Sequence, residues 1–103
     1  MKFVPFTKYE RFESRSFLSE MLKSSPMGQT FGEMEQRLKV MGKLKEAHDD
    51  GVTLEDSEHA TLKAVLDGRR DLGITDEEMF AIYKSVKEAI TVPVPTTTKS
   101  EAP

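Results

Sequence analysis

Residues 74–90 read ITDEEMFAIYKSVKEAI, and this stretch decides the fold class. Its apolar residues recur three or four positions apart, which places them on one face of an α-helix. Thr75 and Glu78 form the Thr-x-x-Glu pattern of a capping box, in which each side chain satisfies an otherwise free backbone N–H. Ile74 and Met79 have the spacing of a hydrophobic staple around that cap. The stretch therefore predicts a helix over 76–90 whose apolar face consists of Met79, Ile82, Tyr83, Val86 and Ile90.

Two more helices are predicted upstream of this stretch. Thr30 and Glu33 form a second capping box, which predicts a long helix over 31–48. The run Asp49-Asp50-Gly51 should end that helix, because glycine suits the left-handed position that follows many helices. A third helix is predicted over 54–67, with Thr53 as its cap, acidic residues in its first turn and Gly68 at its end.

The N-terminal 25 residues leave two interpretations open. Apolar residues at Phe17, Leu18, Met21 and Leu22 predict a short helix that starts near Ser14 or Ser16 and ends before Pro26. Thr7-Lys8-Tyr9-Glu10 is another capping pattern, so the helix could begin earlier, whereas residues 3–6 could form a short extended edge.

The C-terminal residues have a different composition. From Thr91 the chain reads TVPVPTTTKSEAP, which has no face that could pack, and we expect a flexible tail over 91–103. Residues 1–90 should then form a single helical domain, in which 1–25 is an aromatic and basic N-terminal segment. The predicted fold class is all-α, with three to four helices packed as a small antiparallel bundle.

Composition restricts the function classes. The chain has 103 residues, 37% hydrophobic and 32% charged, with a net charge of −3 and no cysteine. This balance is typical of a globular domain. The small negative net charge provides no positive electrostatic field that would attract nucleic acid or an anionic membrane. Apolar runs are far shorter than the roughly 18 residues of a membrane span, and charged residues interrupt any secretion signal near the start. We therefore expect a soluble cytoplasmic protein.

Catalytic and metal-binding patterns are weak in this sequence. His48 and His59 fall on different predicted helices, so nothing in their spacing makes them converge on a metal. Counted from Asp49, the third and twelfth positions of a calcium loop would be Gly51 and Ala60, which do not bind calcium through side chains. The sequence has no cysteine nucleophile, Gly-x-Ser-x-Gly elbow or phosphate-binding glycine loop. We expect no enzymatic activity, no metal and no cofactor.

Two features point instead to binding of a protein. Five aromatic residues of the N-terminal segment are interleaved with Lys and Arg, which is typical either of a docking segment or of an arm that folds back over the core. The helix over 31–48 carries two apolar seams, Phe31-Met34-Leu38-Met41 and Val40-Leu44-Ala47, and Gly42 would permit close approach of another backbone. These seams predict a homodimer, unless the N-terminal aromatics cover the second one within a monomer. The candidate partner-binding residues are Phe3, Phe6, Tyr9, Phe12, Arg11, Val40 and Leu44.

A helix-turn-helix DNA-binding regulator is the alternative function. Ala64, Gly68 and Ile74 have the offsets of such a unit, with Arg69 and Arg70 in the turn. The helix that would enter the groove nevertheless opens with three acidic residues, 76–78, which phosphates would repel. The other interpretation is an ordinary connection with two solvated arginines, and we do not expect nucleic acid to be a partner.

The stretch 34–90 resembles small accessory proteins of tailed phages and prophages, whose function is unassigned. The resemblance is carried by a long helix, EMEQRLKVMGKLKEA, followed by a threonine-capped helix with an acidic start, TLEDSEHATLKAVL. It implies a host cytoplasm and a protein partner from the host or the virion, and it assigns no functional residue. The expected function is therefore that of a non-enzymatic protein–protein interaction factor.

Overall fold

The computed structural model describes residues 1–26, 28–70 and 72–92. The elements in chain order are β1 (Lys2–Pro5), α1 (Ser14–Lys23), α2 (Phe31–Glu46), β2 (Gly51–Leu54), α3 (Asp56–Asp67), α4 (Glu77–Lys87) and β3 (Ile90–Thr91). The fold is mostly helical, as predicted. It is not all-α, because three short strands form a sheet that the sequence analysis missed.

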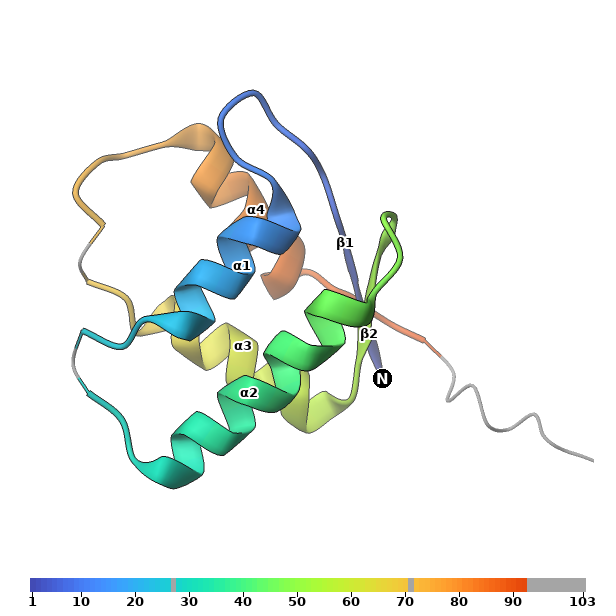
Figure 1. Cartoon of the computed structure of the whole chain (residues 1–103). Coiled ribbons are helices and arrows are strands. Elements are labelled where there is room, and N and C mark those ends of the chain that lie inside the picture. Colours follow the sequence, from blue (N-terminus) through green and yellow to red (C-terminus); the bar gives the residue numbers. More distant parts are fainter. Residues whose placement is uncertain (27, 71, 93–103) are drawn as a thin grey trace, which may run out of the picture.

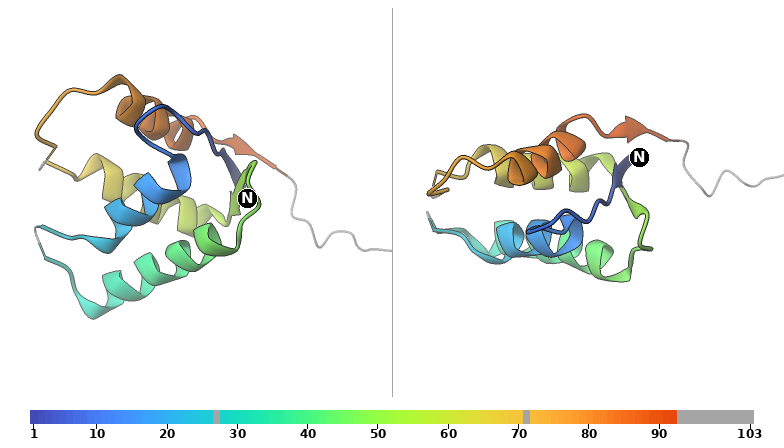
Figure 2. Two further views of the ribbon diagram at one scale, coloured as in Figure 1. Left: turned by 45° about the horizontal axis from the view of Figure 1, so that its top comes forward. Right: turned by 90° about the horizontal axis from the view of Figure 1, so that it is seen from above.

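The helices form two layers, with α1 beside α2 in one and α3 beside α4 in the other (Figures 1 and 2). Successive helices alternate in direction, and the sheet lies at one end of the layers (Figure 1). Every element except β3 contributes buried apolar side chains to a single core. The residues of this core with no exposed surface are Val4, Leu18, Val40, Leu44, Leu54, Leu62, Ile82 and Val86.

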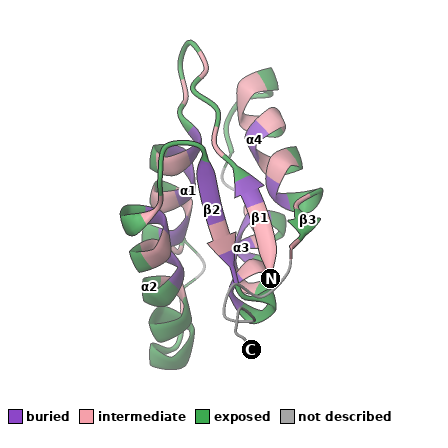
Figure 3. Cartoon of the chain, turned by 90° about the vertical axis from the view of Figure 1, so that its right-hand side faces the viewer, coloured by how far each residue is buried: buried purple, intermediate pink, exposed green. Residues whose placement is uncertain are grey.

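The sheet has the order β2-β1-β3, and both pairs of strands are antiparallel (Figure 3). The central strand is β1, whose Val4 pairs with Val52 and whose Phe3 pairs with both Thr53 and Ile90. The interpretation of residues 3–6 as a short extended edge is therefore right about extended structure over 3–5 and wrong about the edge, because β1 is the central strand. Gly51 has a φ of +156°, and a Cβ there would lie 2.5 Å from the Val4 backbone oxygen. Glycine is needed at this position for the close approach of β1, and the predicted helix-ending role of Gly51 is wrong, since α2 ends at Glu46.

The helix caps confirm one prediction and correct two. At α2 the Thr30 hydroxyl accepts a hydrogen bond from the Glu33 amide (3.1 Å), and the Glu33 carboxylate accepts one from the Thr30 amide (2.7 Å), as predicted. The N-cap of α3 is Glu55, and Thr53 instead lies in β2. At α4 the cap is Asp76, while Thr75 is exposed. Aspartate is as good a cap as threonine, and here it also gains an ion pair.

Both ends of the domain differ from the prediction. The predicted short helix is α1, but residues 7–10 are not helical, and the Thr7 carbonyl accepts a hydrogen bond from the Ser14 amide (3.0 Å). Thr91, which we expected in the tail, belongs to β3, and the Val92 amide donates to the Met1 carbonyl (2.9 Å). The remaining predicted tail, 93–103, lies outside the described residues.

Candidate functional site

A concave apolar surface, which we name the groove, lies between α1, the end of α3, α4 and the connection that precedes α4. Its volume is about 630 Å³. Three large apolar side chains on it are strongly exposed: Leu72 (47%), Ile74 (62%) and Phe80 (62%). Phe17, Met21 and Met79 also line it, and they contact the core or belong to it. Small monomeric proteins rarely expose a contiguous apolar surface of this kind, and where one occurs it commonly marks an interaction site.

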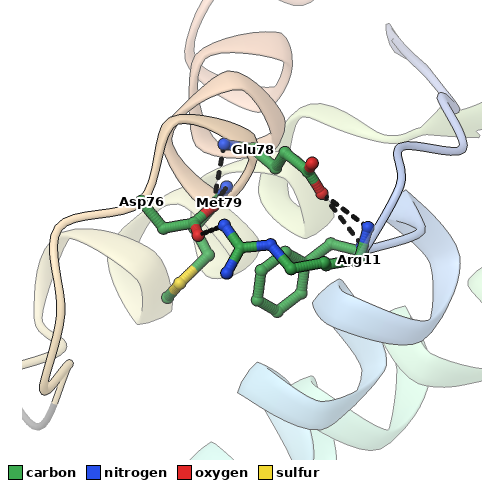
Figure 4. A network of polar contacts seen from close by, with 5 residues as sticks. Arg11, Asp76, Glu78 and Met79 are labelled. Atoms are coloured by element: carbon green, nitrogen blue, oxygen red, sulfur yellow. Dashed lines mark hydrogen bonds and ion pairs between the residues drawn. The ribbon is translucent and has the colours of Figure 1, made fainter.

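One wall of the groove is fixed by the carboxylates at the start of α4. Asp76 caps the helix by accepting hydrogen bonds from the amides of Glu78 (2.8 Å) and Met79 (3.1 Å). Asp76 also pairs with the Arg11 guanidinium, and Glu78 accepts hydrogen bonds from the amides of Arg11 (2.8 Å) and Phe12 (3.2 Å) (Figure 4). These contacts bind the connection between β1 and α1 to α4.

A second polar cluster joins α3 to α4 beside the groove. The Tyr83 hydroxyl donates to Asp67 (2.6 Å), and the Lys63 ammonium donates to the other oxygen of the same carboxylate (2.8 Å). The hydrogen bonds from Lys63 and then Tyr83 lower the pKa of Asp67, and the bond to Asp67 raises the pKa of Tyr83. The cluster keeps Tyr83 at the rim of the groove.

Two arginines bind the carbonyls at the end of α1, Arg69 from the connection after α3 and Arg37 from α2. The Arg69 guanidinium donates to the carbonyls of Met21 (3.1 Å) and Ser24 (2.8 Å), and that of Arg37 donates to the carbonyls of Leu22 (3.1 Å) and Ser24 (3.2 Å). Cations are stabilising where the carbonyls of a helix end are free. The interpretation of Arg69 as solvated is therefore wrong, because it has a structural role beside the groove.

The N-terminal candidate residues lie mainly against the core. Phe6, Tyr9 and Phe12 are half-buried and pack on it, and the Phe3 ring, also half-buried, lies over Gly51. The interpretation as an arm that folds back fits these four residues, while Arg11 is held by Asp76.

Val40 and Leu44 were proposed as partner-binding residues, and this prediction is wrong. Neither has any exposed surface, because the face of α2 that carries them packs toward the rest of the core. A side chain with no exposed surface cannot contact a partner while the domain stays folded.

Sequence analysis did not identify the exposed residues of the groove. Two signals could have indicated them. Leu72 and Ile74 are large aliphatic residues in a connection, where polar residues are usual, and Phe80 lies about 100° around α4 from Met79, off the predicted apolar face.

The two histidines have different surroundings. The His59 Nε2–H donates to the Val86 carbonyl near the end of α4 (2.7 Å), so the interpretation of His59 as solvated is wrong, whereas His48 is exposed beyond the end of α2. Within residues 1–26, 28–70 and 72–92, no three His, Asp or Glu side chains are placed to share a metal ion. In the same part of the chain, none of the helices combines the length and apolar character that crossing a bilayer requires.

Comparison of the chain with models of protein families, with curated proteins and with solved structures found no match.

Proposed function

We propose that the protein is a non-enzymatic interaction factor whose groove binds an apolar segment of another protein. The observation that carries this proposal is the exposure of Leu72, Ile74 and Phe80 on one concave surface. Burial of their exposed parts offers roughly 2–5 kcal/mol before the costs of association, which is enough for a specific but reversible contact.

The groove favours binding over catalysis. Two of the three carboxylates that line the groove make contacts within the protein: Asp76 with the α4 cap and Arg11, and Asp67 with Lys63 and Tyr83. The third, Glu77, is exposed. A general acid or base would need a group free to exchange a proton with a substrate. Asp67 and Asp76 therefore fit a structural role, in which they hold apolar side chains in position.

The partner segment that fits best is an amphipathic helix with basic residues beside its apolar face. Such helices place side chains at i, i+3, i+4 and i+7 into apolar grooves. Glu77 is exposed on the rim, so Lys or Arg on the partner would face opposite charge. From the resemblance of residues 34–90 to phage accessory proteins, we propose a host or virion protein in the host cytoplasm as the partner.

The helix-turn-helix alternative has less support. Nine residues, 68–76, separate Asp67 at the end of α3 from Glu77 at the start of α4, whereas such units have a turn of about 3–4 residues. The three acidic residues 76–78 also surround the end of α4 that would enter DNA.

The groove proposal is tested by affinity capture from the native host with the wild type and matched variants. Phe80→Ser and Ile74→Ser each remove an exposed groove side chain, and Phe31→Ser removes a comparably exposed side chain of α2 outside the groove. We expect one partner to be captured by the wild type and by Phe31→Ser, and to be lost from both groove variants, with helical circular dichroism unchanged. Capture of the same proteins by all four would contradict the proposal. A shift of duplex DNA at low salt would instead support the regulator.

A further inference from the structure

Helix α2 has an exposed apolar stripe on the side that faces away from the core. Phe31 is 86% exposed, Leu38 58% and Met34 36%, and we call these three residues the outer seam. The buried residues of the helix, Val40 and Leu44, lie on the opposite side. Figure 3 shows α2 at the edge of the molecule, with most of its outer surface exposed. The outer seam is separate from the groove, which contains no residue of α2.

Large side chains of the outer seam project from the N-terminal half of α2, whereas the surface in line with them in the C-terminal half is flat at Gly42. Phe31 and Leu38 are two turns apart, and Gly42, eleven residues after Phe31, returns to nearly the same angle around the helix. A Cβ at Gly42 would meet nothing within 4 Å, so the surface there is open. Leu38 lies midway between Met34 and Gly42, at about 6 Å along the axis from each.

Two charges beside the middle of the seam, Glu35 and Lys39, are ordered along the helix. Glu35 and Lys39 lie on one flank of it, both exposed, with the acidic residue toward the N-terminal half and the basic residue toward the C-terminal half. A helix with this order is complementary to itself when a second copy runs in the opposite direction. In a parallel pair the same charges would not face each other, because the flank that carries Glu35 and Lys39 on one helix would lie against the opposite flank of the other helix.

We propose that the outer seam binds the outer seam of a second copy of this chain, with the two α2 helices antiparallel around a two-fold axis at Leu38. In this arrangement the Leu38 side chains meet at the axis, and Met34 of each copy lies over Gly42 of the other. Glu35 of each copy lies within about 3 Å, measured along the helix axis, of the level of Lys39 of the other. Two ion pairs then form by symmetry, and the helix dipoles are opposed.

The expected dimer is weak. The outer seams of two copies remove on the order of 700–1,000 Å² from water, which is less than the roughly 1,200 Å² of stable interfaces. The dimer should therefore dissociate on dilution through the micromolar range. The proposal is independent of the groove, since Phe80→Ser leaves the outer seam unchanged.

A charge-exchange experiment with the full chain tests the pairing by sedimentation equilibrium. Glu35→Lys should raise Kd about tenfold, because two attractive pairs become repulsive. The double variant Glu35→Lys/Lys39→Glu should restore the wild-type Kd, since the exchanged charges again face opposite charges. Leu38→Glu should leave only monomer. A wild type that is monomeric up to millimolar concentration, or a double variant no better than Glu35→Lys, would overturn the proposal.

Cysteine cross-linking tests the direction of the helices, and the chain has no other cysteine. In an antiparallel pair, Leu38→Cys brings two thiols together at the axis, where facing backbones are within disulfide distance. Phe31→Cys places its thiols about 21 Å apart along the axis. We expect rapid disulfide dimerisation of Leu38→Cys only. Equal cross-linking of both variants would indicate a parallel pair, and cross-linking of neither would indicate that the seams do not meet.

Discussion

Replacement of Asp76 by alanine should lower the free energy of unfolding by about 2 kcal/mol. Loss of the N-cap, which holds the amides of Glu78 and Met79, contributes about 1 kcal/mol. Loss of the pair with Arg11 adds about 1 kcal/mol, because the aspartate side chain is 2% exposed but the arginine is 59% exposed and therefore partly screened. For a domain of this size, the sum corresponds to a fall of about 8–16 °C in Tm.

The measurement is a urea denaturation curve followed by far-UV circular dichroism, with two matched variants. Thr75→Ala should change the free energy by less than about 0.5 kcal/mol, because Thr75 is exposed and does not cap α4. Asp76→Asn keeps a capping oxygen but loses the charge, so its loss should lie near 1 kcal/mol. A double-mutant cycle with Arg11→Met isolates the ion pair. Equal losses for Thr75→Ala and Asp76→Ala would refute the assignment of the cap.

Two further predictions concern the cluster beside the groove and the sheet. Asp67→Ala should lower the pKa of Tyr83 toward its ordinary value, measured by tyrosinate absorbance in a Tyr9→Phe background, because the hydrogen bond to Asp67 is what raises it. Since that pKa is raised, the stability from this bond is complete below about pH 10 and is lost as the pH rises through the folded-state pKa; an unchanged titration curve would rule the bond out. Gly51→Ala should destabilise the protein by about 2–4 kcal/mol in urea melts, because its Cβ would lie 2.5 Å from the Val4 backbone oxygen. A neutral effect would show that β1 and β2 do not approach as described.

Local signals in the sequence were sufficient for the helices. The predicted 31–48, 54–67 and 76–90 correspond to α2, α3 and α4, with ends that differ by up to three residues. Capping and apolar periodicity act over one or two turns, so both can be read from neighbouring residues. At α4 the wrong cap was predicted because two adjacent residues, Thr75 and Asp76, could each cap, and the choice between them depends on distant Arg11.

The sheet could not be predicted in this way. Its strands have four, four and two residues, too few for an alternating pattern to be distinguished from a turn. In the sequence, residues 51–54 have the pattern of the end of the helix predicted over 31–48 and the cap of the helix predicted over 54–67. Ile90 has the spacing of the last residue on the apolar face of the helix predicted over 76–90. The pairing of β1 with β2 joins residues about 50 apart, and only the folded chain shows that Gly51 is needed for close approach to Val4.

The two surfaces proposed for binding have a common physical origin in the small size of the domain. Each helix has one face toward the core, and the side chains of the core already fill it, with Val40, Leu44, Leu62 and Ile82 fully buried. Apolar residues beyond those faces, such as Phe31 and Phe80, therefore remain in water unless another chain covers them. Sequence periodicity does not distinguish the buried apolar residues of a helix from the exposed ones. For this reason it predicted an interface on α2 but assigned that interface to the buried residues Val40 and Leu44. Which of the two seams becomes buried depends on the side of α2 against which α1 and α3 pack, and the whole fold determines that side.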